Sequence, residues 1–174
     1  MKTVKYVFWG SLVALSALWW QADQTDWSNL NGVFAWRNVL SQTTGILGIG
    51  VMSLAMLLAV RPLILERHLD GLDKMYRLHK WLGIAGLVMA ISHWLIAKGP
   101  KWMVALGWLE RRAKRQRPAL PEGSLQQFFM DQRGLAEGIG EWAFYLAALL
   151  MVLALIKRFP YRRFVQTHRW LAAA

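Results

Sequence analysis

Histidine is the residue of this sequence with the most evident chemistry, because a neutral imidazole binds metal ions and haem iron. The chain has four histidines and no cysteine, which excludes disulfides, thiolate metal sites and iron–sulfur clusters. His79 and His93 fall in one apolar stretch and are separated by fourteen positions. At about 100° per residue, this spacing puts both imidazoles on one side of a helix, about 21 Å apart along its axis.

Two imidazoles so far apart cannot share one ion, since metal–nitrogen bonds are only about 2 Å long. The spacing suits two stacked haems, each of which needs a second axial imidazole from another helix. His168 is the other histidine at the edge of an apolar stretch, and on the predicted topology it lies level with His79. Histidines that only hydrogen-bond between helices are the alternative. His68 lies in a charged segment, and we expect it to be solvated.

The elements that position these histidines are predicted to be membrane-spanning helices. Of 174 residues 56% are hydrophobic and 11 are Trp, which is too apolar for a water-soluble domain of this size. A bilayer core about 30 Å thick requires about 20 apolar helical residues. Four stretches meet or nearly meet that length, at about residues 4–20, 44–64, 78–97 and 141–156, and a fifth begins near residue 161. We therefore expect an all-α integral membrane helical bundle, one domain over residues 1–174, with four transmembrane helices plus the start of a fifth.

Charge gives an orientation and argues against a nucleic-acid partner. The net charge of +11 comes mostly from cations between apolar runs, which is typical of membrane borders. The positive-inside rule favours a cytoplasmic amino terminus, although the basic loop from Arg111 to Arg117 would then lie outside. The cations that support this orientation are Lys2 and Lys5, then Arg61, Arg67, Lys74 and Arg77, then Lys157, Arg158, Arg162 and Arg163.

Other features of the spans allow two interpretations each. The first apolar stretch, after Lys2 and Lys5, also resembles a secretory signal peptide, but its tryptophans suit a membrane interface and favour an uncleaved helix. Arg77 and Lys80 flank His79, where they could pair with haem propionates or extend to lipid phosphates. Three glycines in the second span would allow the close approach of a flat ring or, more simply, of another helix. They are Gly45, Gly48 and Gly50.

Two segments resemble a known family. The stretch Asp73-Lys-Met-Tyr-Arg-Leu-His-Lys-Trp-Leu-Gly83, with Ser92-His93-Trp94, is similar to the third helix of bacterial ferric reductase-like transmembrane proteins, relatives of the NADPH oxidases. The segment Lys157-Arg-Phe-Pro-Tyr-Arg-Arg-Phe-Val-Gln-Thr-His-Arg-Trp170 resembles the entrance to that family's fifth helix. With the order of the spans, the resemblance covers nearly the whole chain.

The resemblance implies a six-helix domain that holds two b-type haems through histidine pairs on helices three and five. His79 and His93 match the third-helix pair, and His168 matches the first histidine of the fifth helix. The second fifth-helix histidine, the sixth helix and the domain for FAD and NAD(P)H do not occur in these residues. We therefore expect an incomplete carboxyl terminus, one or two haems, and no competence as an oxidoreductase without a longer protein or complex.

The function that the resemblance implies is transmembrane electron transfer through haem b, as the membrane portion of an NAD(P)H-dependent ferric reductase. A quinol-fed haem b subunit of a periplasmic reductase system and a non-enzymatic helical membrane protein are the alternatives. The expected location is the cytoplasmic (inner) membrane, in a multi-pass arrangement. The expected partners are the lipid bilayer, haem iron held by His79, His93 and His168, and a flavin/NAD(P)H dehydrogenase domain or another electron donor.

Overall fold

The computed structural model describes residues 2–110, 123–156, 166 and 168. In these residues all regular structure is helical. The chain divides into two compact units, Met1–Leu109 and Glu110–Ala174. The first unit holds the helices α1 (Lys2–Ala22), α2 (Val33–Ala59), α3 (Leu63–His68) and α4 (Leu72–Ala105), together with a short 3-10 turn, η1 (Trp27–Asn29); the second holds α5 (Leu125–Leu155).

Three helices are long and apolar enough to cross a membrane, namely α2, α4 and α5. At 1.5 Å per residue even α2, with 27 residues, is about 40 Å long, which exceeds the roughly 30 Å hydrocarbon core. The predicted helical class and these three spans are confirmed. The predicted first span forms α1, but its lysine, serines and tryptophans lower its hydropathy, so it is not among the three. A fourth span and the start of a fifth stay predictions.

The ends of the spans differ from the predicted ones. The second span begins at Val33 rather than at residue 44, because Gly32, with φ 83°, ends the preceding loop and nothing after it interrupts the helix. It ends at Ala59 rather than at residue 64, because Arg61 has a left-handed φ of 55° and Pro62 follows. Both α4 and α5 extend well beyond the predicted apolar stretches, since polar residues at a membrane border continue a helix as readily as apolar ones.

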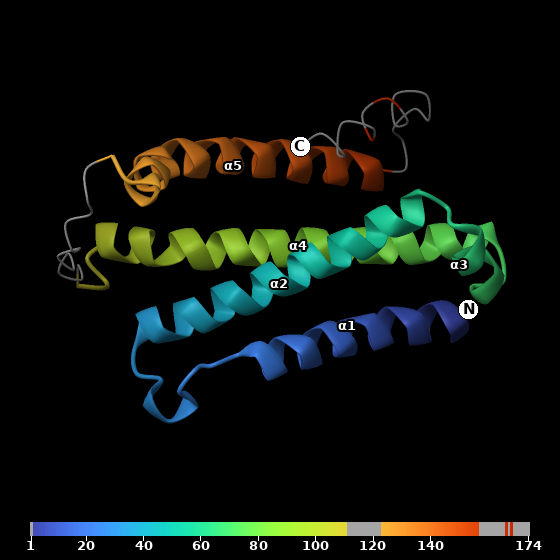
Figure 1. The fold of residues 1–174 in the computed structure, drawn as a ribbon, viewed down its shortest axis with the longest axis horizontal. Coiled ribbons are helices and arrows are strands. Elements are labelled where there is room, and N and C mark those ends of the chain that lie inside the picture. Colours follow the sequence, from blue (N-terminus) through green and yellow to red (C-terminus); the bar gives the residue numbers. More distant parts are fainter. Residues whose placement is uncertain (1, 111–122, 157–165, 167, 169–174) are drawn as a thin grey trace. The chain divides into compact units, whose positions relative to one another are not determined.

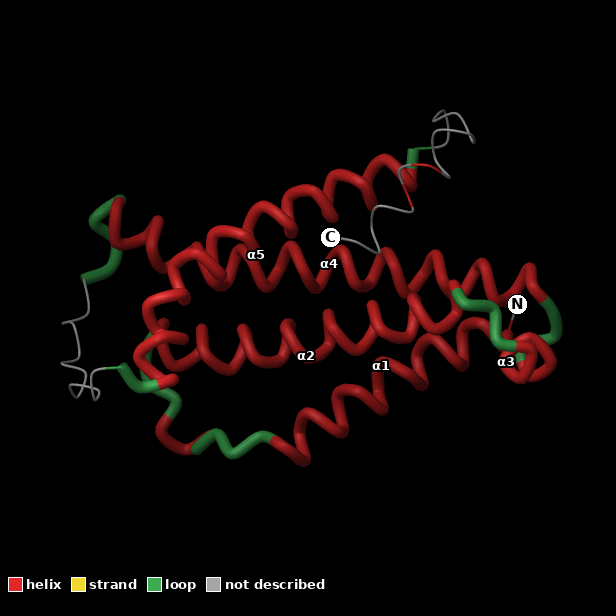
Figure 2. Tube along the Cα trace, turned by 45° about the horizontal axis from the view of Figure 1, so that its top comes forward, coloured by secondary structure: helices red, strands yellow, loops and turns green. Residues whose placement is uncertain are grey.

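An antiparallel pair, α2 and α4, forms the centre of the first unit, and α1 packs against both helices (Figure 1; Figure 2). Val51 and Leu82 are the largest fully buried side chains of this pair. Small residues allow the helix backbones to approach closely. In lipid the hydrophobic effect does not drive helices together, so close van der Waals packing must stabilise the pair. At Gly86 the side chain of Met52 fills the place where a Cβ would lie, and at Gly50 the side chain of Leu15 from α1 does so.

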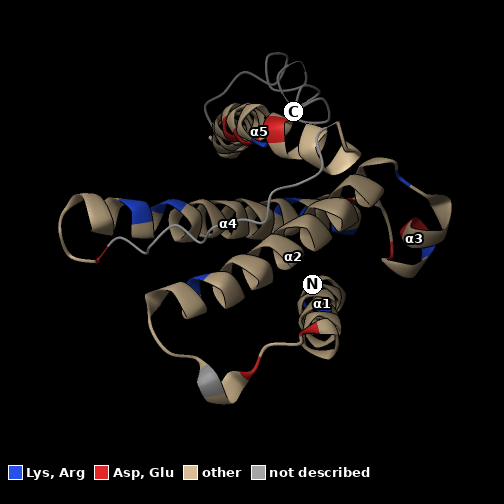
Figure 3. Ribbon diagram, turned by 60° about the vertical axis from the view of Figure 1, so that its left-hand side comes forward, with Lys and Arg blue, Asp and Glu red and all other residues tan. Residues whose placement is uncertain are grey.

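Charged side chains are confined to the helix ends of this pair, and the long middle stretches of α2 and α4 are almost wholly tan in Figure 3. No charged residue occurs between Arg37 and the end of α2, or between Lys80 and Lys98 in α4. At the start of α4, Lys74 Nζ donates to Asp70 at 2.8 Å, and this hydrogen bond holds the pKa of the Asp70 carboxyl below its usual value. Arg77 Nε lies 3.1 Å from Asp73 Oδ2. Both pairs are exposed, so they add little stability.

We expect Gly86→Val to destabilise the α2–α4 pair, because a Cβ at position 86 would lie 2.6 Å from Met52 Sδ and 2.9 Å from its Cγ. Overpacking of this kind costs about 1–3 kcal/mol, which unfolding in detergent, followed by circular dichroism, would measure. Gly10→Val on α1 is the matched control, since a Cβ there meets nothing within 4 Å. Equal stability of the two variants would contradict the packing described.

Candidate functional site

His79 and His93 both lie on the side of α4 that contacts α2, as their spacing predicts. His79 Nδ1 lies 2.8 Å from the Ala55 carbonyl oxygen, and His93 Nδ1 lies 3.0 Å from the Ser41 carbonyl oxygen. Both side chains are half-buried. The two rings therefore contact the backbone of the neighbouring helix.

The contacts of His79 and His93 with α2 have the same arrangement at two positions along the helix pair. Ala55 and Ser41 are separated by fourteen positions on α2, as the two histidines are on α4. Because the helices run antiparallel, one register brings each histidine to a carbonyl of α2. A third contact follows one turn further along both helices, where Arg37 Nη2 donates to the Ala97 carbonyl oxygen at 3.4 Å.

The carbonyl partners decide which ring nitrogen carries the proton. A carbonyl oxygen only accepts, so Nδ1 must donate at both histidines. In the neutral ring the other nitrogen, Nε2, then holds the lone pair. Thr44 agrees with this assignment at His93: its Oγ1 donates to the Leu40 carbonyl at 2.7 Å, which leaves the oxygen to accept from His93 Nδ1 at 3.2 Å. In both histidines the lone pair of the neutral ring therefore falls on Nε2.

Gly45 lets the His93 ring lie against the backbone of α2. A Cβ at this position would meet His93 Cε1 at 3.4 Å and Nδ1 at 3.5 Å, so a larger side chain would displace the ring from Ser41. A Cβ at Gly48 would meet Met89 Cβ at 3.5 Å, and one at Gly50 would meet Leu15. In the described part of the chain, these three glycines therefore face side chains of α4 and α1. That finding favours helix packing over a flat ring as their explanation.

The remaining predicted site residues are Arg77, Lys80 and His168. Arg77 forms its ion pair with Asp73, with a side chain 52% exposed, and Lys80 is also exposed. Their pairing with haem propionates stays a prediction. His168 belongs to the second unit, where it is helical and half-buried. Its partnership with His79 likewise stays a prediction, and the basic loop from Arg111 to Arg117 lies outside the described residues.

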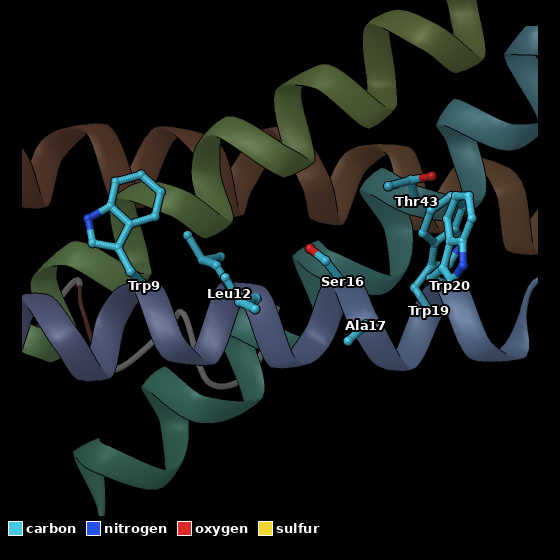
Figure 4. A pocket seen from close by; sticks show the side chains of 8 residues that line it. Trp9, Leu12, Ser16, Ala17, Trp19, Trp20 and Thr43 are labelled. Carbon is cyan, nitrogen blue, oxygen red and sulfur yellow. The ribbon is translucent and has the colours of Figure 1, made fainter.

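Other candidate sites in the described residues are poor. His68 is exposed, and its Nδ1 contacts the Ile64 carbonyl within α3 at 2.7 Å, so it has a local partner. No group of three or more His, Asp or Glu side chains that could hold an ion occurs in the described ranges. An apolar groove of about 560 Å³ lies along α1, with Trp9 towards one end and Trp19 and Trp20 towards the other (Figure 4). No histidine lines it.

The donor set fits haem better than a bare ion. Each histidine offers one imidazole nitrogen at its own level, oriented by a hydrogen bond from the opposite ring nitrogen, which is the usual second contact of a metal-binding histidine. A lone axial imidazole of this kind suits an iron whose other in-plane ligands come from a porphyrin. The residues present therefore fit one axial ligand for each of two haems.

Four contributors to this site were missed from the sequence. The carbonyl groups of Ser41 and Ala55 give no signal, because every residue has one. The hydroxyl of Thr44 gave a weak signal as a polar group within an apolar run. Arg37 gave a clear one, since it is the sole charged residue of α2.

Comparison with known proteins adds one finding. A family model described as "Ferric reductase like transmembrane component" matches residues 44–174, about three quarters of the chain. The match includes His79, His93 and His168, whereas α1, Arg37 and Ser41 precede it. No curated protein and no solved structure matches.

We expect a bulky side chain at position 45 to be coupled energetically to His93. Gly45→Leu should destabilise the protein by about 1–3 kcal/mol through overpacking, while Gly45→Ala should be nearly neutral, because its Cβ makes an ordinary contact. In a His93→Ala background the cost of Gly45→Leu should fall by about 1 kcal/mol. Unfolding in detergent measures all four proteins, and strictly additive effects would contradict the contact.

Proposed function

We propose that this chain, which belongs to the ferric reductase like transmembrane component family, carries electrons across a membrane through haem b. The family supports membrane electron transfer as the general activity. The observation that supports the haem is the pair of half-buried histidines on α4, each with Nδ1 held by a carbonyl of α2. An imidazole fixed in this tautomer carries its lone pair on Nε2, the nitrogen that would bind an iron in this proposal.

The residues of the chain have separate roles in this proposal. His79 and His93 would each supply one axial nitrogen, at levels about 21 Å apart along α4. The Ala55 and Ser41 carbonyls orient the rings and increase the basicity of Nε2. His168 would supply the second axial nitrogen at the level of His79, and Arg77 and Lys80 would pair with the propionates there. When bound, haem supplies a one-electron couple that is buried in the bilayer.

The surroundings of the histidines suit electron transfer rather than ion transport. Between Lys80 and Lys98 the helix α4 carries no charged residue, and no buried polar or charged residue occurs among those described. An ion crossing there would find no charged partner on α4, and a charge without a partner in hydrocarbon costs several kcal/mol. An electron held on a large buried ring avoids most of that cost.

The proposed partners and orientation follow from the family and the charges. An electron donor in the cytoplasm, either a flavin domain with FAD reduced by NAD(P)H or a separate dehydrogenase, would deliver electrons at the His79 end. The cations at that end, including Lys2, Lys5 and Arg67, favour its placement on the cytoplasmic side of the inner membrane. An acceptor such as a ferric chelate would then be reduced at the His93 end, as an NAD(P)H-dependent ferric reductase requires.

We expect the purified protein to show a reduced-minus-oxidised difference spectrum typical of b-type haem. His79→Ala and His168→Ala should remove the same spectral component, because both ligate one iron, and His93→Ala should remove a different one. His68→Ala, at an exposed histidine outside the site, should leave the spectrum unchanged. A folded wild-type protein without haem absorbance, obtained from cells with ample haem, would refute the proposal.

A further inference from the structure

We propose that Arg37 raises the reduction potential of the iron bound at His93. The inference rests on the proposed function, because it assumes that His93 binds haem. Arg37 would tune the iron through its charge alone and is not itself a ligand.

The position of Arg37 follows from the register that places the histidines. Arg37 precedes Ser41 by one turn of α2, and Ala97 follows His93 by one turn of α4. The hydrogen bond from Arg37 Nη2 to the Ala97 carbonyl therefore holds the guanidinium about 6 Å further along the helix axis than the Ser41–His93 contact. Arg37 is half-buried and turned towards α4 instead of extending into water.

A proline lies about one turn beyond the acceptor of Arg37. Pro100 is inside α4 and buried. It has no N–H to offer the carbonyl four residues earlier, which is that of Ile96 and directly precedes Ala97. The Ala97 carbonyl itself accepts from Arg37 across the helix pair. An arginine guanidinium hydrogen-bonds through a rigid fork.

Arg37 is the charged residue of the α2–α4 pair that lies nearest to His93 in register. Near His79, two of the cations at the start of α4 pair with acids, Lys74 with Asp70 and Arg77 with Asp73. From Lys74 onward α4 has no carboxylate, and α2 has none along its whole length. No carboxylate of these two helices therefore lies near His93, whereas the Arg37 cation lies one turn from its level.

A nearby cation stabilises the reduced iron, which carries one positive charge fewer than the oxidised iron. For a unit charge about 10 Å away and an effective dielectric constant of about 20, Coulomb's law gives a roughly tenfold change in the reduction equilibrium. For a one-electron couple, tenfold corresponds to about 59 mV. A rise of this size at the His93 level would favour electron movement towards it from the His79 level.

The test is a spectroelectrochemical titration of the haem-loaded protein. The component that His93→Ala removes identifies the iron at His93. In Arg37→Gln the reduction equilibrium of this component should become about tenfold less favourable, which is a fall of about 59 mV in its reduction potential. The potential of the other component should not change. Arg37→Lys, which keeps the charge, should retain most of the wild-type potential. Lys5→Gln removes one cation from α1 and is the matched control, for which the His93 component should not move.

A second variant covers the case in which Arg37→Gln does not fold. Val33→Glu places a carboxylate one turn before Arg37, at a side chain 41% exposed, where it can pair with the guanidinium and offset its charge. It should lower the potential of the same component by a smaller amount. Unchanged potentials in Arg37→Gln, or in Val33→Glu where only that variant folds, would overturn the inference. So would an equal fall in Arg37→Lys and Arg37→Gln.

The same titration separates this inference from the proposed function. A wild-type protein without haem absorbance contradicts the proposed function and removes the basis of the inference with it. If the wild-type protein binds haem but the reduction potential of its His93 component does not change with the charge at position 37, only the inference is contradicted.

Discussion

The site depends on one constraint, the need of each half-buried imidazole N–H for an acceptor within an apolar span. In the described unit that acceptor is a backbone carbonyl of α2, Ala55 for His79 and Ser41 for His93. An unpaired N–H in an apolar environment would cost several kcal/mol, so the contact fixes the ring and its tautomer together. Because the same fourteen-residue spacing recurs on both helices, a single antiparallel register satisfies both histidines. Because that register places the proton on Nδ1, it leaves the lone pair on Nε2.

Packing makes this register possible, because carbonyls can be reached from a neighbouring helix only where the backbones are close. Gly45 leaves room for the His93 ring, and Gly86 accepts the side chain of Met52. The small side chain of Ala55, buried in the core, exposes its own carbonyl to His79. The residues that hold the helices together and the residues that orient the histidines are thus interleaved on one face. A change in the packing of α2 and α4 would therefore change the orientation of the histidine rings.

The sequence predicted the parts of this arrangement that depend on periodicity. The spacing of His79 and His93 predicted their common side, and the apolar runs predicted the greater part of α2 and α4 and about half of α5. The helix ends were harder to predict from the sequence. Gly32 and Arg61 limit α2 through their backbone conformation, and the segment 33–43 is polar enough to resemble a loop. The acceptors at Ser41 and Ala55 could not be predicted, since a carbonyl has no sequence signature and the register that selects it arises from packing. The pairing of His168 with His79 stays a prediction.

The tautomer of the two histidines tests this arrangement most directly. Nuclear magnetic resonance of protein with ¹⁵N-labelled histidine, purified without haem in lipid or detergent, distinguishes a protonated ring nitrogen from one that carries a lone pair; His79→Gln and His93→Gln assign the signals. We expect the proton on Nδ1 and the lone pair on Nε2 in both rings. A proton on Nε2 of either ring, with Nδ1 unprotonated, would contradict the carbonyl contacts, because a carbonyl of α2 could then not be the partner.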